Sequence, residues 1–247
     1  RLAAAWTPDP ASMPLETRVA ALDWQRLADD LDRHGCAATG PLLSPVECAG
    51  LIGLYDEERH FRSRVIMARH GFGAGEYRYF AYPLAPPVAS LREALYPPLA
   101  VIAARWATAL GAAADYPATL ARYLARCHEA GQRRPTPLLL KYGAGDYNCL
   151  HQDLYGELVV PLQATFLLSA PGRDFTGGEF VLTEQRPRRQ SRAEVVTLGQ
   201  GCGVIFTVNR RPVQGARGVS SVTMRHGVSR LHKGARFTLG VIFHDAA

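Results

Sequence analysis

The sequence lacks the features that mark membrane-spanning, secreted and disulfide-stapled proteins. It has no apolar run of about 18 residues or more, so we expect no transmembrane helix. Its 5 cysteines are odd in number and form no CxxC pair, which favours reduced thiols in a cytoplasmic protein. The first residues show no basic-then-apolar signal pattern, and no internal repeat or low-complexity segment is visible.

Lysine is also scarce, because Lys141 and Lys233 are the only two in the chain. The net charge of +6 therefore comes from arginine, and it is uneven. Residues 170–236 hold 12 Lys and Arg against 4 Asp and Glu, a local charge of +8, which leaves −2 for the rest. Such an asymmetry indicates a surface for nucleic-acid phosphates or acidic substrates, although a genome-wide preference for arginine would produce the same composition.

What the chain does contain is ample apolar material, 47% of 247 residues, for one integrated domain. Residues 1–14 are rich in Pro and Ala, as is typical of an N-terminal arm. Residues 15–136 show mainly helical spacing, and residues 137–247 change to short apolar runs of period two, which indicate strands. We expect an α+β fold in which a helical half packs against a jelly roll, the cupin-like double-stranded β-helix.

Helical spacing and capping boxes predict four helices in residues 15–136. They run from near Glu16 to Gly35, from Ser44 to about Phe61, from Ser90 to Leu110 with a kink or restart at Pro97-Pro98, and from Tyr116 to Ala130. Between them, residues 70–80 hold three alternating glycines followed by an aromatic run. This segment is compatible with a mobile substrate lid or with a plain glycine loop leading into an edge strand.

Eight strands are predicted in the second half. They are Leu138–Lys141, Leu150–Asp153, Leu162–Leu168, Gly178–Thr183, Glu194–Leu198, Gly203–Val208, Ser220–His226 and Phe237–Phe243. The arginine-rich run 186–192 between two of them is expected to be an exposed loop.

A His-x-Asp triplet in this half is the first candidate for chemistry. Because successive side chains of a strand point to opposite faces, His151 and Asp153 are expected on one face with Gln152 turned away. His226 is the best candidate for a third ligand, and His232 and His244 are the alternatives. Two histidines and one carboxylate leave coordination positions open, as in non-haem Fe(II) oxygenases.

A candidate anion site accompanies this triad. Arg236 opens the last predicted strand, and its guanidinium is suited to bind a carboxylate through two hydrogen bonds. Thr238 lies on the same strand face, and Tyr142, nine residues before His151, has a phenol that can donate to the same acid. Tyr147 and Tyr155 flank the metal pair and are either pocket residues or cross-strand packing.

In combination these motifs resemble the prolyl 4-hydroxylase-like branch of the Fe(II)/2-oxoglutarate-dependent oxygenases. The resemblance is close over about 110 residues and rests on Tyr142, His151-Gln-Asp153, Gly177-Gly178-Glu179, His226 and Arg236. The phrases LHQDLYGE, DFTGGEFVLTEQRPR and HGVSRLHKGARFTLGVIFHDA are similar to a bacterial subgroup of these oxygenases labelled as acting on damaged DNA.

The resemblance implies a dioxygenase that uses Fe(II), 2-oxoglutarate and O2, hydroxylates a C–H bond and releases succinate and CO2. By position, His151, Asp153 and His226 would bind iron, and Arg236 with Tyr142 would bind the carboxylates of 2-oxoglutarate.

Three substrates remain open at this point: an alkylated base in nucleic acid, a prolyl or other protein side chain, and a free amino acid. A metal-binding cupin-like module without activity is the non-enzymatic alternative, against which Arg236 argues, because a metal binder has no use for a carboxylate site.

Overall fold

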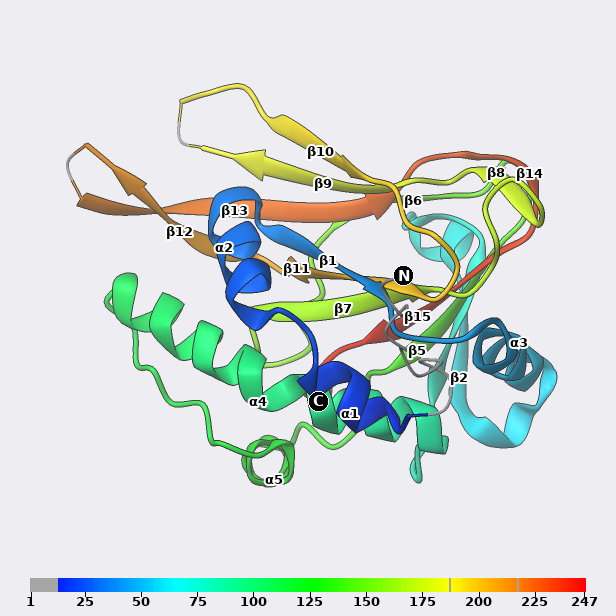
Figure 1. Ribbon diagram of the computed structural model, residues 1–247, viewed down its shortest axis with the longest axis horizontal. Helices are drawn as coiled ribbons and strands as arrows, with labels where there is room; N and C mark the ends of the chain where they lie inside the picture. The colour runs from blue at the N-terminus through cyan, green and yellow to red at the C-terminus, as the bar shows by residue number, and fades with distance from the viewer. Residues whose placement is uncertain (1–12, 187, 217) are drawn as a thin grey trace, which may run out of the picture.

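Helices and two antiparallel sheets form successive layers in the computed structural model, which describes residues 13–186, 188–216 and 218–247 (Figure 1). The N-terminal arm predicted at residues 1–14 therefore lies almost entirely outside the described residues. The helices cover one face of a seven-stranded sheet, and a six-stranded sheet faces its other side. This arrangement confirms the predicted α+β class. None of the described helices is long and apolar enough to cross a membrane.

The helical elements lie mostly in the first half of the chain. They are α1 Leu15–Ala20, α2 Trp24–His34, α3 Pro45–Gly53, α4 Pro86–Ala109, α5 Leu120–Glu129 and the 3-10 helices η2 Leu54–Asp56, η3 Glu58–His60 and η4 Met67–His70.

The seven-stranded sheet has the order β1-β11-β7-β15-β5-β4-β2. Its strands are β1 Cys36–Pro41, β2 Phe61–Ile66, β4 Glu76–Phe80, β5 Leu138–Tyr142, β7 Leu162–Leu167, β11 Cys202–Thr207 and β15 Arg236–Val241. The six-stranded sheet has the order β10-β9-β13-β6-β3, with β12 also paired to β13. Its strands are β3 Gly73–Ala74, β6 Tyr147–His151, β9 Phe180–Gln185, β10 Arg192–Val196, β12 Arg210–Gly215 and β13 Gly218–Val228. A small third sheet pairs β14 Leu231–Gly234 with β8 Phe175–Gly177.

The first half of the chain differs from the prediction in where its helices begin and end. The helix predicted from near Glu16 to Gly35 is two helices, because the Asp23 side chain accepts a hydrogen bond from the Arg26 backbone and starts α2 as a separate helix. Gly35 ends α2 in the left-handed conformation, as predicted. The helix assigned to Ser90 begins earlier, at Pro86, so Ser90 is not its cap. It continues through Pro97 and Pro98 as one element, since its buried face holds it against the core.

Four strands in residues 36–80 were only partly foreseen. The capping box at Ser44 is present, but α3 ends at Gly53 and the chain has become strand β2 by Phe61. The glycine segment forms β3, which pairs with β6 at the edge of its sheet, and leads into β4. The glycines do lead into a strand, but that strand, β4, lies between β5 and β2 and is not at an edge, so the expected edge strand is instead β3, within the glycine segment. Movement of the segment as a lid stays a prediction.

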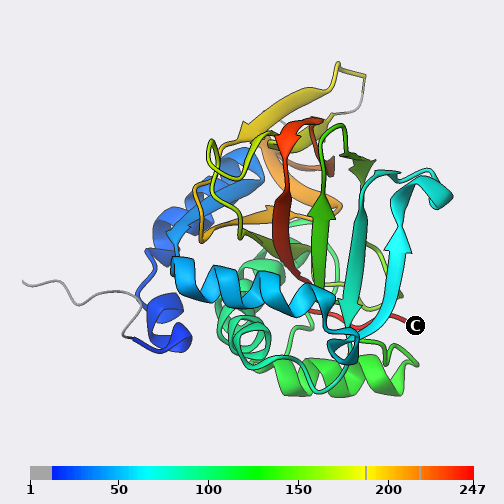
Figure 2. The same ribbon diagram turned by 90° about the vertical axis from the view of Figure 1, so that its right-hand side faces the viewer.

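Alternate side chains of β15 point to opposite faces of the seven-stranded sheet. Leu239 and Val241 point toward the helices and belong to the core that α4 shares with the seven-stranded sheet. Arg236 and Thr238 point the other way, into a cavity between the sheets. Figure 2 shows β15 and β5 side by side, with α4 and α5 at one end of the molecule and the β9–β10 hairpin at the other.

Candidate active site

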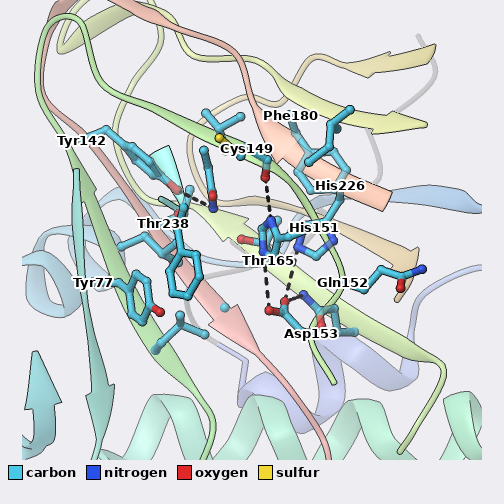
Figure 3. A pocket seen from close by; sticks show the side chains of 18 of the residues that line it. Tyr77, Tyr142, Cys149, His151, Gln152, Asp153, Thr165, Phe180, His226 and Thr238 are labelled. Atoms are coloured by element: carbon cyan, nitrogen blue, oxygen red, sulfur yellow. Dashed lines mark hydrogen bonds and ion pairs between the residues drawn. The ribbon is translucent and has the colours of Figure 1, made fainter. Parts of the chain in front are cut away.

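Three side chains from two segments converge at the centre of this cavity (Figure 3). The nitrogen and oxygen atoms that His151, Asp153 and His226 offer lie within 4.8 Å of one another. The two Asp153 oxygens are 3.4 Å from Nε2 of His151 and 3.3 Å from Nε2 of His226. The three residues expected as metal ligands are therefore brought together with their donor atoms facing a common point.

Sheet register explains this convergence. His226 on β13 is paired directly with His151 on β6, and the centroids of their rings are 4.2 Å apart. Strand β6 ends at His151, two residues before the predicted end, so Asp153 lies just beyond the strand. Its side chain still points to the same side as His151, and Gln152 points away and donates to the backbone of Met224.

The Asp153 carboxylate is held by two further side chains. Tyr155 donates to Oδ1 at 2.7 Å and Gln163 donates to Oδ2 at 2.8 Å. The Tyr155 hydroxyl in turn accepts from Tyr79 at 2.9 Å. Tyr155 therefore lines the cavity, which was one of the two expected roles, and it also holds the Asp153 carboxylate. The sequence signal for Gln163 is weak, since it is a single glutamine in the mostly apolar strand β7, and the structure shows it buried.

The charges in the cluster follow from these contacts. Burial by itself raises the pKa of the Asp153 carboxyl, but its contacts with His151 and His226 outweigh burial and hold the pKa well below the ordinary range. Burial lowers the pKa of His226, and the neighbouring His151 lowers it further. Asp153 is therefore ionised and His226 neutral at pH 7, which are the protonation states that metal ligands require.

His151 is oriented by its other ring nitrogen. Nδ1 is 2.8 Å from the Cys149 carbonyl, which can only accept, so Nδ1 carries the proton and Nε2 has its lone pair toward Asp153. Burial favours the neutral ring, but the Asp153 carboxylate, which accepts a hydrogen bond from Nε2 once the ring is protonated, outweighs burial and raises the pKa of His151.

Neither alternative histidine reaches the cluster. His232 is exposed on β14. His244 is fully buried, and its Nδ1 accepts a hydrogen bond from the Val160 backbone at 3.3 Å. Both lie outside the group of residues whose donor atoms converge.

The burial of His244 gives a prediction about stability and pH. Burial lowers its pKa to about 4, whereas a histidine in the unfolded chain titrates near about 6.5. Between these values the unfolded chain binds a proton that the folded protein does not. Stability therefore falls as pH is lowered through this window, by about 3 kcal/mol from this group.

We expect His244→Phe to flatten the dependence of the free energy of unfolding on pH between about 6.5 and 4. Urea unfolding of both proteins across this range measures it. The variant loses some stability at every pH because the Val160 amide loses its acceptor, so the slope is the diagnostic quantity. Equal slopes for the two proteins would contradict the prediction.

Arg236 supplies an unpaired positive charge to the same cavity. It is 2% exposed, and its Nε and Nη1 atoms have no hydrogen-bond partner among the described residues. Burial lowers the pKa of this guanidinium, although Tyr142 and Glu179 oppose the change, and the group remains charged. A buried cation with free donors is costly unless an anion joins it, which indicates that the cavity takes an anionic ligand.

The other predicted anion-binding residues line the cavity beside Arg236. Tyr142 is paired with Arg236 across β5 and β15 and is fully buried. Burial raises the pKa of its phenol to about 12, so it remains a donor at neutral pH. Its oxygen accepts from Asn148 at 3.3 Å. Thr238 faces the cavity two residues along β15.

Gly178 makes room for the arginine. A Cβ atom there would lie 2.1 Å from Leu231 Cδ1 and 3.1 Å from Arg236 Cδ, and the residue has a φ of +68°. The glycine pair at 177–178 therefore does more than turn the chain, because Gly178 allows the aliphatic part of Arg236 to pack closely against the backbone.

The cavity measures about 300 Å³ and connects the three converging residues with Arg236. Its lining is mainly apolar, with Tyr77, Leu140 and Phe206 among the walls and Phe72 and Leu150 at the outer end. A small dicarboxylate fits such a volume between the metal ligands and the guanidinium.

Comparison with known proteins gives a family match. Residues 75–246 match the model of a family described as "Oxygenase, catalysing oxidative methylation of damaged DNA". Two uncharacterized proteins of Mycobacterium tuberculosis, from strains CDC 1551 and H37Rv, are each 53% identical to this chain over 168 residues. The match covers 68% of this chain and 72% of each of theirs.

Solved structures with low identity share the fold. A prolyl hydroxylase from Trichoplax adhaerens, in complex with a hypoxia inducible factor peptide fragment, has a TM-score of 0.53 at 12% identity and covers 96% of both chains. A prolyl 4-hydroxylase from Phytophthora capsici has a TM-score of 0.50 at 16% identity, over 96% of this chain and 65% of that one. These similarities confirm the predicted double-stranded β-helix.

Proposed function

Since the chain belongs to the oxygenase family described as catalysing oxidative methylation of damaged DNA, we propose that it is an Fe(II)- and 2-oxoglutarate-dependent dioxygenase. It would hydroxylate a C–H bond of its substrate and release succinate and CO2. The observation that carries this proposal is one cavity with a two-histidine, one-carboxylate cluster and a buried arginine whose donors are free.

The residues present fit both groups. His151, Asp153 and His226 would hold the metal, and this donor set is the one that non-haem Fe(II) oxygenases use. Arg236 would bind the far carboxylate of 2-oxoglutarate, with Tyr142 and Thr238 as additional donors. Bound together, Fe(II) and 2-oxoglutarate supply the activation of O2 that no amino-acid side chain provides.

The protein residues prepare the site and protect it. Hydrogen bonds from Tyr155 and Gln163 fix the Asp153 carboxylate, and the Cys149 carbonyl fixes the tautomer of His151. The mainly apolar walls exclude water from the reacting centre, which strengthens each electrostatic contact inside.

Tyr155→Phe tests this support of the carboxylate. We expect metal affinity to fall about 10- to 100-fold, as is typical when a partner of a metal ligand is removed, because Asp153 loses one of its two donors. Titration with Mn(II) measures the affinity, and Tyr147→Phe, at an exposed tyrosine close to the same metal ligands, is the matched control. Equal affinities for the two variants would show that Tyr155 does not position Asp153.

A damaged base in DNA is the substrate that we propose. The family description names damaged DNA, and the charge of +8 in residues 170–236 suits a polyanion. Hydroxylation of an N-methyl group on a base gives an N-hydroxymethyl group, which loses formaldehyde and restores the base.

The test of the proposed function is succinate formation. Purified protein with Fe(II), 2-oxoglutarate and O2 is offered methylated oligonucleotides, proline peptides and free amino acids, and mass spectrometry records gain of oxygen or loss of methyl. We expect succinate in step with loss of methyl from the oligonucleotide. Oxygen gain only on a proline peptide or an amino acid would support the oxygenase activity but contradict the proposed DNA substrate. Absence of succinate under every condition would contradict the proposed function.

A further inference from the structure

Two β-hairpins project from the six-stranded sheet, and both lie away from α5 (Figure 1). One joins β9 to β10 and the other joins β12 to β13. Both are attached to β13, the strand that carries His226, since β9 pairs with one of its edges and β12 with the other. The hairpins therefore connect directly to the site.

These hairpins carry the positive charge of the chain. Residues 180–228 contain eight arginines, two glutamates and no aspartate or lysine, a net charge of +6 that equals that of the whole chain. Glu184 is buried and occupied by Arg186 and Arg211, so it does not neutralise the surface.

Several of these guanidiniums are available to a partner. Arg188 and Arg189 at the β9–β10 tip, Arg210 on β12 and Arg225 on β13 are all exposed. They have no ion pair with any residue that the structure describes. Exposed arginines without acidic neighbours are suited to phosphate oxygens, which accept their hydrogen bonds in pairs.

A second feature lies at the mouth of the cavity. Phe72 lines the cavity and is 48% exposed, and the His70 ring stacks on it with centroids 5.3 Å apart and an interplanar angle of 22°. Leu150 continues this apolar rim. An exposed aromatic beside a cavity indicates a ligand with a flat apolar face.

Backbone pairing holds this aromatic in place. The Phe72 amide donates to the Met67 carbonyl at 3.2 Å, and the Phe72 carbonyl accepts from the Cys149 amide at 2.9 Å. Gly73 permits the close approach to β6, because a Cβ atom there would lie 2.4 Å from the Tyr147 carbonyl oxygen. The ring is therefore presented at a fixed position relative to the metal ligands on β6.

We propose that the two hairpins bind the phosphates of a nucleic-acid strand, and that Phe72 stacks on the base presented to the cavity. This inference rests on the proposed function and specifies how its substrate is held. A peptide would need neither feature in this combination, whereas an unpaired base offers a flat face and its backbone offers regularly spaced negative charge.

The spacing agrees with such a strand. Leu182 is paired with His226, and Arg188 lies six residues further along the β9–β10 hairpin. At about 3.3 Å per residue, the basic tip lies roughly 20 Å from the metal ligands along the hairpin. One strand of a duplex advances about 3.4 Å per nucleotide, so this distance corresponds to about six nucleotides. A single strand can therefore contact the tip and the cavity together.

The phosphate contacts are tested with the double variant Arg188→Gln/Arg189→Gln. Its matched control, Arg122→Gln/Arg133→Gln, removes the same charge from exposed positions on and after α5, at the opposite end of the molecule. Binding of fluorescein-labelled single-stranded DNA is followed by anisotropy at several salt concentrations. At 0.1 M salt, we expect the affinity of the hairpin variant to be lower than that of wild type by a factor of about ten or more. The slope of log K against log salt concentration should be smaller in magnitude by about 1.4. The control should match wild type.

The stacking contact is tested with Phe72→Ala and Phe72→Trp. We expect Phe72→Ala to lower the affinity for single-stranded DNA about fivefold or more, as loss of one base–aromatic stack does, and Phe72→Trp to retain it. Binding of poly-glutamate, which has charge but no bases, should not change in either variant. Val46→Ala, at an exposed apolar residue on α3, is the control.

The outcomes separate the two levels of the proposal. This inference would be overturned by equal DNA affinity of the hairpin variant and its control, or by absence of DNA binding in wild type. It would also be overturned if wild type bound poly-glutamate and DNA equally and Phe72→Ala had no effect. Succinate formation without DNA is scored separately, and the hairpin variant should equal wild type. Absence of succinate from wild type with every substrate offered would contradict the proposed function and leave the DNA-binding comparison intact.

Discussion

Replacing His226 by alanine is expected to remove metal binding and 2-oxoglutarate turnover together. The residue contributes one of three converging donor atoms, and its Nε2 faces Asp153. The remaining His151 and Asp153 are two ligands where the site needs three. We expect the loss of metal affinity to exceed the roughly 100-fold upper range seen when only a partner of a ligand is removed. Mn(II) titration and a succinate assay measure the two effects.

The control for this experiment is His232→Ala, because His232 is exposed on β14 and outside the cluster. Circular dichroism and thermal unfolding of both variants should show a folded protein. A fully active His226→Ala protein would show that the third ligand has been assigned wrongly.

Arg236→Met should weaken 2-oxoglutarate binding strongly and leave the ligand-free protein at least as stable. Losing one partner of a buried, charged hydrogen-bonded pair costs about 2–5 kcal/mol, which corresponds to roughly 30- to 3,000-fold in affinity. The unliganded protein, in contrast, no longer has to bury free guanidinium donors. We expect its free energy of unfolding to rise by about 1 kcal/mol, because methionine fills much of the same space and the contacts with Tyr142 and Phe175 are only partly lost.

Calorimetric titration of the Mn(II)-loaded protein with 2-oxoglutarate, together with urea unfolding without ligand, measures both effects. Arg236→Lys should fall between wild type and Arg236→Met, because an ammonium keeps the charge and loses the planar pair of donors. Arg230→Met, at an exposed arginine directly before β14, should bind 2-oxoglutarate as wild type does. Unchanged 2-oxoglutarate affinity in Arg236→Met would remove Arg236 from the site.

Much of the site was accessible from the sequence because strand geometry is regular. The alternation of side chains places Arg236 and Thr238 on one face, and the structure shows both lining the cavity. Each of the eight strands predicted after residue 137 corresponds to an observed strand, with ends shifted by a few residues. Short apolar runs between turns specify such strands well, because burial of one face sets the register.

The remaining parts depend on contacts between distant segments. Strand β1 has the sequence CAATGP, which has little intrinsic preference for a strand, and exists because it pairs with β11. Gln163 stands ten residues from Asp153, and no local pattern indicates that its amide reaches the carboxylate. The break before α2 was not expected from the helical spacing, and it follows from the capping hydrogen bond that Asp23 accepts from the Arg26 backbone.

Diffraction from crystals grown with Mn(II) and 2-oxoglutarate, recorded for the anomalous signal of manganese, tests the central claim most directly. The account predicts one manganese site bonded to His151, Asp153 and His226, with the far carboxylate of 2-oxoglutarate against the Arg236 guanidinium. Manganese bound elsewhere, or 2-oxoglutarate oriented with both carboxylates away from Arg236, would contradict it.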